Sequence, residues 1–117
     1  MKLLIVDDNV EIGDMLKQYL ELENIEVVVT NDGKQGLNLI QKNTFDKILL
    51  DMAMPEFSGL DVLENLKSQF FTNMNKIFIL TASEINSEMA EKIKSYGIKQ
   101  IIAKPINMSD LLKKLEN

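Results

Sequence analysis

Four features that often carry function are missing from this chain of 117 residues: cysteine, histidine, arginine and long hydrophobic runs. The lack of cysteine excludes disulfides and thiolate metal sites. The lack of histidine excludes a histidine-based catalytic triad, and it removes the most common zinc ligand and neutral-pH proton carrier. Because every basic residue is a lysine, the chain also has no guanidinium group to hold phosphate or guanine with two parallel hydrogen bonds.

Negative charge outweighs positive charge, with a formal net charge of −5 and a sequence pI of ≈ 4.7. We therefore expect no direct contact with nucleic acid, whose backbone is itself negative. The first apolar run, residues 3–6, is too short for a signal peptide or a membrane span, so we predict a cytoplasmic protein with no membrane contact. The length predicts a single domain over residues 1–117 with no effector domain present, and 45% hydrophobic residues suffice for a core.

Five short apolar runs are spaced along the chain. They are rich in branched residues and mostly continuous, which is typical of strands that are buried on both faces of a parallel sheet. The runs are residues 3–6, 25–29, 47–50, 77–80 and 100–103.

Longer amphipathic stretches follow these runs and predict helices, because their apolar residues fall on one stripe. The predicted helices are residues 9–23, 32–43, 58–70, 84–96 and 107–116. Four of them begin with a pair that resembles a capping box, namely Asp8 with Glu11, Asp32 with Gln35, Ser58 with Asp61, and Asn107 with Asp110. Strands joined by crossover helices run parallel, so the sequence predicts an α/β domain, a doubly wound five-stranded parallel sheet with helices on both faces.

Polar residues stand where the predicted strands end: Asp7 and Asp8, then Asp51, Thr81 and Lys104. The carboxyl ends of parallel strands share one rim, where ligands bind. Three carboxylates at that rim need a cation or a raised pKa, and an all-oxygen site suits Mg²⁺. A carboxylate beside Mg²⁺ can attack phosphorus and form an aspartyl phosphate. Taken singly, the same residues have ordinary explanations, with Asp8 as a helix N-cap and Asp51 as a turn residue.

Four segments carry a family resemblance: IVDDN, LLDMAMPEFSG, ILTAS and IAKPI. In their order and spacing the chain resembles, over its whole length, the response-regulator receiver domains of two-component signalling, of the chemotaxis-Y type. The resemblance implies a flavodoxin-like (βα)5 fold with strand order 2-1-3-4-5. It also implies a phospho-acceptor switch, phosphorylated by a sensor histidine kinase, a phosphotransfer protein or an acyl phosphate. The phosphate would change a surface that binds an unknown downstream protein.

The resemblance also assigns roles at the rim. Asp51 would be the phosphoryl acceptor, and Mg²⁺ would be the cofactor. Asp8 would bind the metal directly and Asp7 largely through water, with the backbone carbonyl of Ala53 as a further ligand.

Two further site residues follow from the same resemblance. Thr81 would turn its hydroxyl to the phosphoryl group, and Lys104 would pair with that group. The Lys104–Pro105 peptide is expected to be cis. Such a domain catalyses only its own phosphoryl transfer and dephosphorylation, so we do not expect an enzyme that acts on other substrates. A phosphatase would need a D-x-D after the first strand and a nucleotide binder a glycine-rich turn, and the segment DDNVEIGD has neither.

The chain departs from the family at Ile101, where tyrosine or phenylalanine is usual. An isoleucine cannot reproduce the rotation of an aromatic ring, so a binding or scaffold receiver that is not phosphorylated stays open as an alternative. A phosphorelay intermediate and a phosphate sink also stay open. The small residues Ala53 and Ser83 predict that water reaches the phosphoryl group with ease, and we expect a monomer or a weak dimer.

Overall fold

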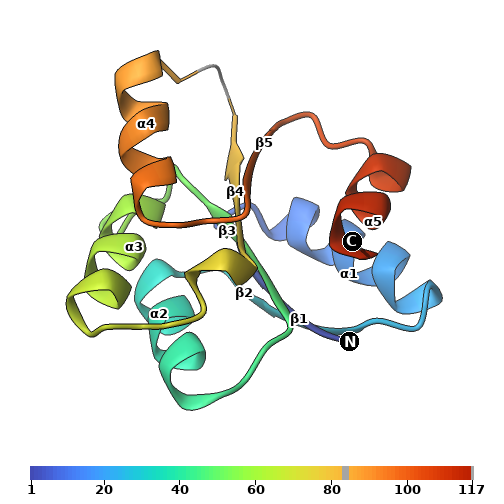
Figure 1. The fold of residues 1–117 in the computed structure, drawn as a ribbon. Helices are drawn as coiled ribbons and strands as arrows, with labels where there is room; N and C mark the ends of the chain where they lie inside the picture. Colours follow the sequence, from blue (N-terminus) through green and yellow to red (C-terminus); the bar gives the residue numbers. More distant parts are fainter. Residues whose placement is uncertain (83–84, 117) are drawn as a thin grey trace.

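The computed structural model describes residues 1–82 and 85–116, which alternate strands and helices (Figure 1). The elements are β1 (Lys2–Val6), α1 (Val10–Leu22), β2 (Glu26–Thr30), α2 (Gly33–Lys42), β3 (Lys47–Asp51), α3 (Gly59–Ser68), the short 3-10 helix η1 (Met74–Lys76), β4 (Ile77–Thr81), α4 (Ser87–Ser95), β5 (Gln100–Ala103) and α5 (Met108–Glu116). Neighbouring strands all pair in parallel, in the order β2-β1-β3-β4-β5. The predicted fold class and strand order are confirmed.

The sheet separates two hydrophobic cores, because successive residues of a strand point to opposite faces. On β1, Leu4 and Val6 join the core under α2, α3 and α4, whereas Leu3 and Ile5 join the core under α1 and α5. Figure 1 shows the same division, with α1 and α5 on one side of the sheet and the other three helices opposite. Strands buried on both faces explain why the apolar runs are continuous rather than alternating.

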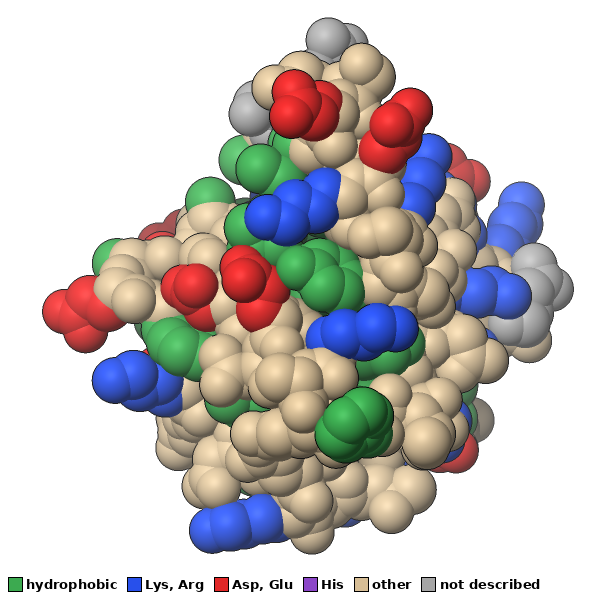
Figure 2. Space-filling model, turned by 60° about the vertical axis from the view of Figure 1, so that its left-hand side comes forward, with side chains coloured by type: hydrophobic (Ala, Val, Ile, Leu, Met, Phe, Trp, Pro, Cys, Tyr) green, Lys and Arg blue, Asp and Glu red, His purple; other side chains and the backbone are tan. Residues whose placement is uncertain are grey.

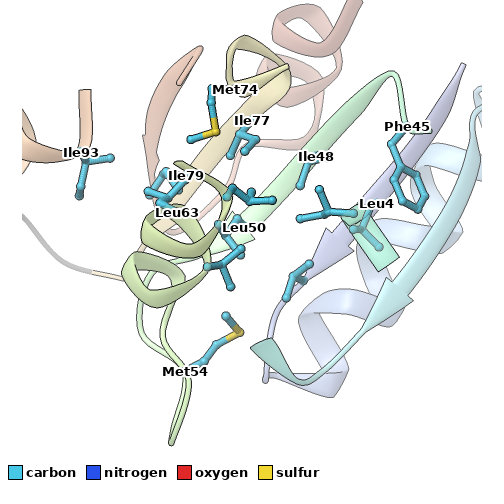
Figure 3. Close-up of a cluster of buried hydrophobic side chains, with 14 residues drawn as sticks. Leu4, Phe45, Ile48, Leu50, Met54, Leu63, Met74, Ile77, Ile79 and Ile93 are labelled. Carbon is cyan, nitrogen blue, oxygen red and sulfur yellow. The ribbon is translucent and has the colours of Figure 1, made fainter. Parts of the chain in front are cut away.

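The larger core lies between the sheet and α2, α3 and α4. Figure 3 shows Ile48 and Leu50 of β3 beside Ile77 and Ile79 of β4, with Leu63 of α3 packed over them. All five side chains are at most 2% exposed. This packing buries one face of β3 and β4, and both strands end at the predicted rim.

The helix starts agree only in part with the predicted caps. Ser58 and Asp61 form the predicted reciprocal capping box at α3. The prediction that Asp8 caps α1 is wrong: α1 begins at Val10, and the side chain of Asn9 accepts the hydrogen bond from the Ile12 N–H at 3.1 Å. Asp8 is thereby left at the rim, outside the helix.

The starts of α2 and α4 differ in detail from the predictions, whereas that of α5 agrees. Asp32 caps α2 by accepting from the Lys34 N–H, but its expected partner Gln35 accepts a hydrogen bond from the Thr30 hydroxyl instead. At α4 the cap is Asn86, so the helix begins later than the predicted residue 84. At α5, Asn107 accepts from the Asp110 N–H as expected.

A groove of about 680 Å³ lies between α4 and β5, lined by Ile85, Ala90, Lys94, Ile98, Lys99, Gln100 and Ile101. We call it the α4–β5 groove. Figure 2, in which the side that carries α3 and α4 comes forward, shows hydrophobic side chains in small groups between lysines and acids. Within the described residues, no helix is both long enough and apolar enough to cross a membrane.

Candidate functional site

Asp7 is the first residue after β1 and is fully buried. Its N–H continues the ladder by donating to the Thr30 carbonyl at 3.1 Å. Its carboxylate accepts the Asn9 N–H at 2.9 Å and the Lys104 ammonium at 3.0 Å. A charge without access to water needs such partners, and Asp7 has them on both oxygens.

Asp51 is the last residue of β3 and is 3% exposed. Asp7, Asp8 and Asp51 each offer a carboxylate oxygen, and these atoms all lie within 4.8 Å of one another. Asp8, unlike the other two, is exposed to solvent. The structure therefore brings the three predicted acids together at the carboxyl edge of β1 and β3.

Lys104 supplies the positive charge of the site. Its ammonium lies 3.0 Å from an oxygen of Asp7 and 3.6 Å from an oxygen of Asp51, and its side chain is only 15% exposed. The Lys104 N–H donates to the Thr81 carbonyl at 2.7 Å, which extends the pairing of β4 with β5. The Lys104–Pro105 peptide is cis, as predicted.

The remaining predicted residues lie at the same edge. Thr81 is the last residue of β4 and is 6% exposed. The Ala53 N–H donates to Asp51 at 3.4 Å, which places the loop after β3 against the acid. Ser83, the other small residue named above, lies outside the described residues.

The pKa of the Asp51 carboxyl is raised from 3.8 to about 7, and burial is the largest cause. The negative charge of Asp7 contributes to the increase, while Lys104 opposes it. A hydrogen bond with the Asp8 side chain also favours the protonated form of Asp51. One lysine thus does not balance three carboxylates, and the cluster gains stability from an additional cation.

The loop after β3 turns sharply away from the site. The Phe57 N–H donates to the Pro55 carbonyl at 2.7 Å, and Glu56 between them has a φ of 66°. The loop then returns so closely that a Cβ at Gly59 would lie 2.4 Å from the Asp51 carbonyl oxygen. Only glycine fits there without moving the backbone of the acid.

The donor set fits a hard divalent cation. Three carboxylates supply oxygen only, and oxygen ligands are what Mg²⁺ prefers, usually with one or two carboxylates and several waters. The exposed carboxylate of Asp8 leaves the cluster open on one side to water and to a phosphate oxygen. Asp7, Asp8 and Asp51 are the residues that could hold the ion.

A doubly wound sheet in this strand order, with an acidic cluster at its carboxyl edge, defines the class of flavodoxin-like domains with a charged switch-point site. Within that class, the chain belongs to the response regulator receiver domain family, whose family model matches residues 3–116. It is thus a receiver domain of two-component signalling.

Individual relatives agree with this assignment. The chain is 34% identical over 116 residues to the transcriptional regulatory protein CpxR of Escherichia coli (strain K12), covering 97% of this chain and 47% of that protein. The solved structure of chemotaxis protein CheY4 of Vibrio cholerae matches with a TM-score of 0.86 and 31% identity, covering 98% of this chain and 95% of that one. The response regulator TrrA of Thermotoga maritima, solved in complex with Mg²⁺-BeF, matches with a TM-score of 0.80 and 28% identity, covering 98% and 96%. The chain spans about half the length of the curated relatives it matches.

Proposed function

We propose that this domain is a phospho-acceptor switch in which Asp51 takes a phosphoryl group in a Mg²⁺-dependent reaction. One observation carries the proposal: Asp7, Asp8 and Asp51 offer oxygens within 4.8 Å of one another, and Lys104 contacts two of the three acids. A purely structural site has no need to gather three carboxylates around one lysine, because their repulsion costs stability.

In the proposed reaction a carboxylate oxygen of Asp51 forms a bond to phosphorus. The bond from phosphorus to the leaving group breaks, and its electron pair goes to the leaving group. That group is the imidazole nitrogen of a phosphohistidine or the carboxylate of an acyl phosphate. Because this chain has no histidine, the phosphohistidine belongs to another protein, which we infer to be a sensor histidine kinase or phosphotransfer protein.

The surroundings of Asp51 make a cation necessary for the proposed reaction. Attack requires the ionised carboxylate, whereas burial and the charge of Asp7 favour the protonated form, with the pKa of Asp51 raised to about 7. Mg²⁺, when bound, would neutralise charge on Asp51 and on the phosphoryl oxygens. The ammonium of Lys104, which contacts Asp7 and Asp51, is the proposed partner of the added phosphate charge. The hydroxyl of Thr81, at the next strand end, is the proposed hydrogen-bond donor to it.

The relatives support the phospho-acceptor role, and they do not identify the partners of this chain. TrrA was solved with Mg²⁺-BeF, so a domain of this fold holds that group. We infer that the added charge at Asp51 biases a protein-binding surface between two states.

Mass spectrometry of the intact protein tests the proposal. The protein is incubated with acetyl phosphate, with and without Mg²⁺, alongside Asp51→Asn and the control Asp46→Asn, which removes an acid from the opposite edge of the sheet. We expect a gain of one phosphoryl group that needs Mg²⁺, is absent in Asp51→Asn and is retained in Asp46→Asn. A gain that persists in Asp51→Asn would overturn the assignment of the acceptor.

Ile101 favours a second candidate, a binding module that does not use phosphate. Its half-buried side chain lines the α4–β5 groove, at the position where the family usually has an aromatic ring. Absence of any mass gain, with acetyl phosphate and with a phosphorylated histidine phosphotransfer protein, would favour this candidate. Turnover of an added phosphate ester would instead indicate an enzyme.

A further inference from the structure

The side chain of Asn31 reaches from the end of β2 to the backbone of the acidic pair. Its Nδ2 donates to the carbonyl oxygen of Asp7 at 2.8 Å, although the two residues are 24 positions apart in the chain. Only the amide nitrogen can donate to a carbonyl oxygen, so the orientation of the side chain is defined by this contact.

That carbonyl oxygen belongs to the peptide group that links Asp7 to Asp8. The Asp7 N–H is held by the Thr30 carbonyl, and its carboxylate is held by Asn9 and Lys104. The hydrogen bond from Asn31 fixes the remaining polar group of Asp7, and with it the plane of the Asp7–Asp8 peptide.

Asp8 depends on this peptide more than its neighbours do. Asp7 and Asp51 are enclosed by the protein, whereas Asp8 is exposed and lies before the start of α1 at Val10. Apart from its hydrogen bond with Asp51, little packing directs its carboxylate. We therefore infer that the orientation of the preceding peptide helps to set where that carboxylate points.

The close approach of α1 to β2 makes the contact possible. A Cβ at Gly13 would lie 2.9 Å from Val29 Cγ1 and 3.8 Å from Asn31 Nδ2. The missing side chain lets the first turns of α1 lie against the end of β2. Asn31 is thus brought beside the turn that carries the two acids.

We propose that Asn31 is a positioning residue for the Mg²⁺ site: it holds the Asp7–Asp8 peptide so that the Asp8 carboxylate faces Asp51. This rests on the proposed function, because it presumes that the acidic cluster binds Mg²⁺. Residues that orient metal ligands from behind typically change metal affinity by about 10- to 100-fold when they are removed.

Titration of the metal-free protein with Mg²⁺ tests the proposal. Binding is monitored by calorimetry and by the backbone amide signals of Asp8 and Asn9 in NMR. Asn31→Ala removes the donor, and Asn38→Ala removes an exposed asparagine of α2 as the matched control. We expect about tenfold weaker Mg²⁺ binding in Asn31→Ala, with the wild-type affinity in Asn38→Ala. The thermal midpoint of the metal-free Asn31→Ala protein should stay close to that of the wild type, which a general loss of structure would not allow.

Asn31→Asp is the second variant, because it keeps the shape of the side chain but removes the donor. Its carboxylate would repel the Asp7 carbonyl, so we expect weaker Mg²⁺ binding despite the added negative charge. Affinity within twofold of wild type in Asn31→Ala, or tighter binding in Asn31→Asp, would overturn the role of Asn31. If the wild-type protein itself binds no Mg²⁺, the proposed function fails as well, so the two failures are distinguishable.

Discussion

The acidic rim and the α4–β5 groove border the same sheet, but they are built in opposite ways. At the rim, the charged side chains of Asp7, Asp51 and Lys104 are largely buried and make short polar contacts, such as the 3.0 Å pair of Lys104 with Asp7. The groove is lined by half-buried isoleucines, such as Ile98 and Ile101, together with the exposed lysines Lys94 and Lys99. Polar contacts require particular atoms at particular distances, whereas apolar packing accepts many side chains of similar volume.

Under the proposed function, we expect the rim to carry the chemistry and the groove to take part in the readout. A substitution at the rim changes charge, pKa and metal binding, while a substitution in the groove changes a contact surface. The sequence shows the same division between the two regions. The rim has the residues that the resemblance to receiver domains implies, whereas Ile101 in the groove departs from that resemblance.

The largest expected effect concerns the buried charge of Asp51. Its pKa is raised in the folded state, so the native protein retains a proton that the unfolded chain loses above about pH 4. The free energy of unfolding of the metal-free protein should therefore fall as pH rises from about 4 to about 7. An asparagine side chain has no charge to bury at high pH. Asp51→Asn should therefore be more stable than wild type by about 2–4 kcal/mol at about pH 8.

Urea unfolding followed by circular dichroism across this pH range measures the effect, with Asp14→Asn, an exposed acid of α1, as control. Added Mg²⁺ should stabilise the wild type and reduce the difference between the two proteins. Parallel pH profiles for wild type and Asp51→Asn would contradict the raised pKa.

The next effect is on metal binding. Asp8→Asn removes the exposed carboxylate of the cluster, and we expect Mg²⁺ affinity to fall more than tenfold. Calorimetric titration measures it, and the same Asp14→Asn variant serves as control for the loss of one negative charge. Equal losses in both variants would mean that net charge, and not the geometry of the rim, attracts the ion.

A smaller effect is expected in the groove. Ile101→Ala removes part of a half-buried side chain, and we expect a loss of about 1 kcal/mol in unfolding free energy, below the range for fully buried positions. The rate of phosphorylation by acetyl phosphate should remain within about twofold of wild type, because no rim contact is removed. A large fall in that rate would show that rim and groove are not independent.

The smallest effect is expected at Phe70, which belongs to neither region. Its side chain is 87% exposed, and its φ is 60°. Phe70→Gly should stabilise the protein slightly, by about 0.5 kcal/mol, because glycine accepts this conformation at no steric cost. Phe70→Ala retains a Cβ and should gain nothing. If the two variants show equal thermal midpoints, backbone conformation is not the cause.

Much of the fold could be predicted because its signals are local. Runs of branched apolar residues, such as residues 77–80, predict the strands. The residues at the ends of these strands converge because parallel strands share one edge. Ser58 and Asp61 were predicted as a capping box because both lie within one turn of α3. The prediction that Asp8 caps α1 is wrong because Asn9, the next residue, is an equally good N-cap. The choice between the two residues depends on where β1 ends.

Contacts between distant segments could not be predicted. Nothing near Asn31 indicates that its amide reaches Asp7, because the contact exists only once β1 and β2 are paired. Likewise, Gln35 fits a capping box by its spacing, yet the Thr30 hydroxyl binds it in the folded protein. The roles of the site residues in phosphoryl transfer and metal binding stay predictions, and these residues are Asp7, Asp8, Asp51, Ala53, Thr81 and Lys104.

Gly59 has a consequence for genetic variation. The residue has no functional group, yet the space for a side chain there is filled by the backbone of Asp51. At position 59 even one methyl group would have to displace the acid. A variant at this position that lost signalling would therefore look like the loss of a catalytic residue, although the lesion would be steric.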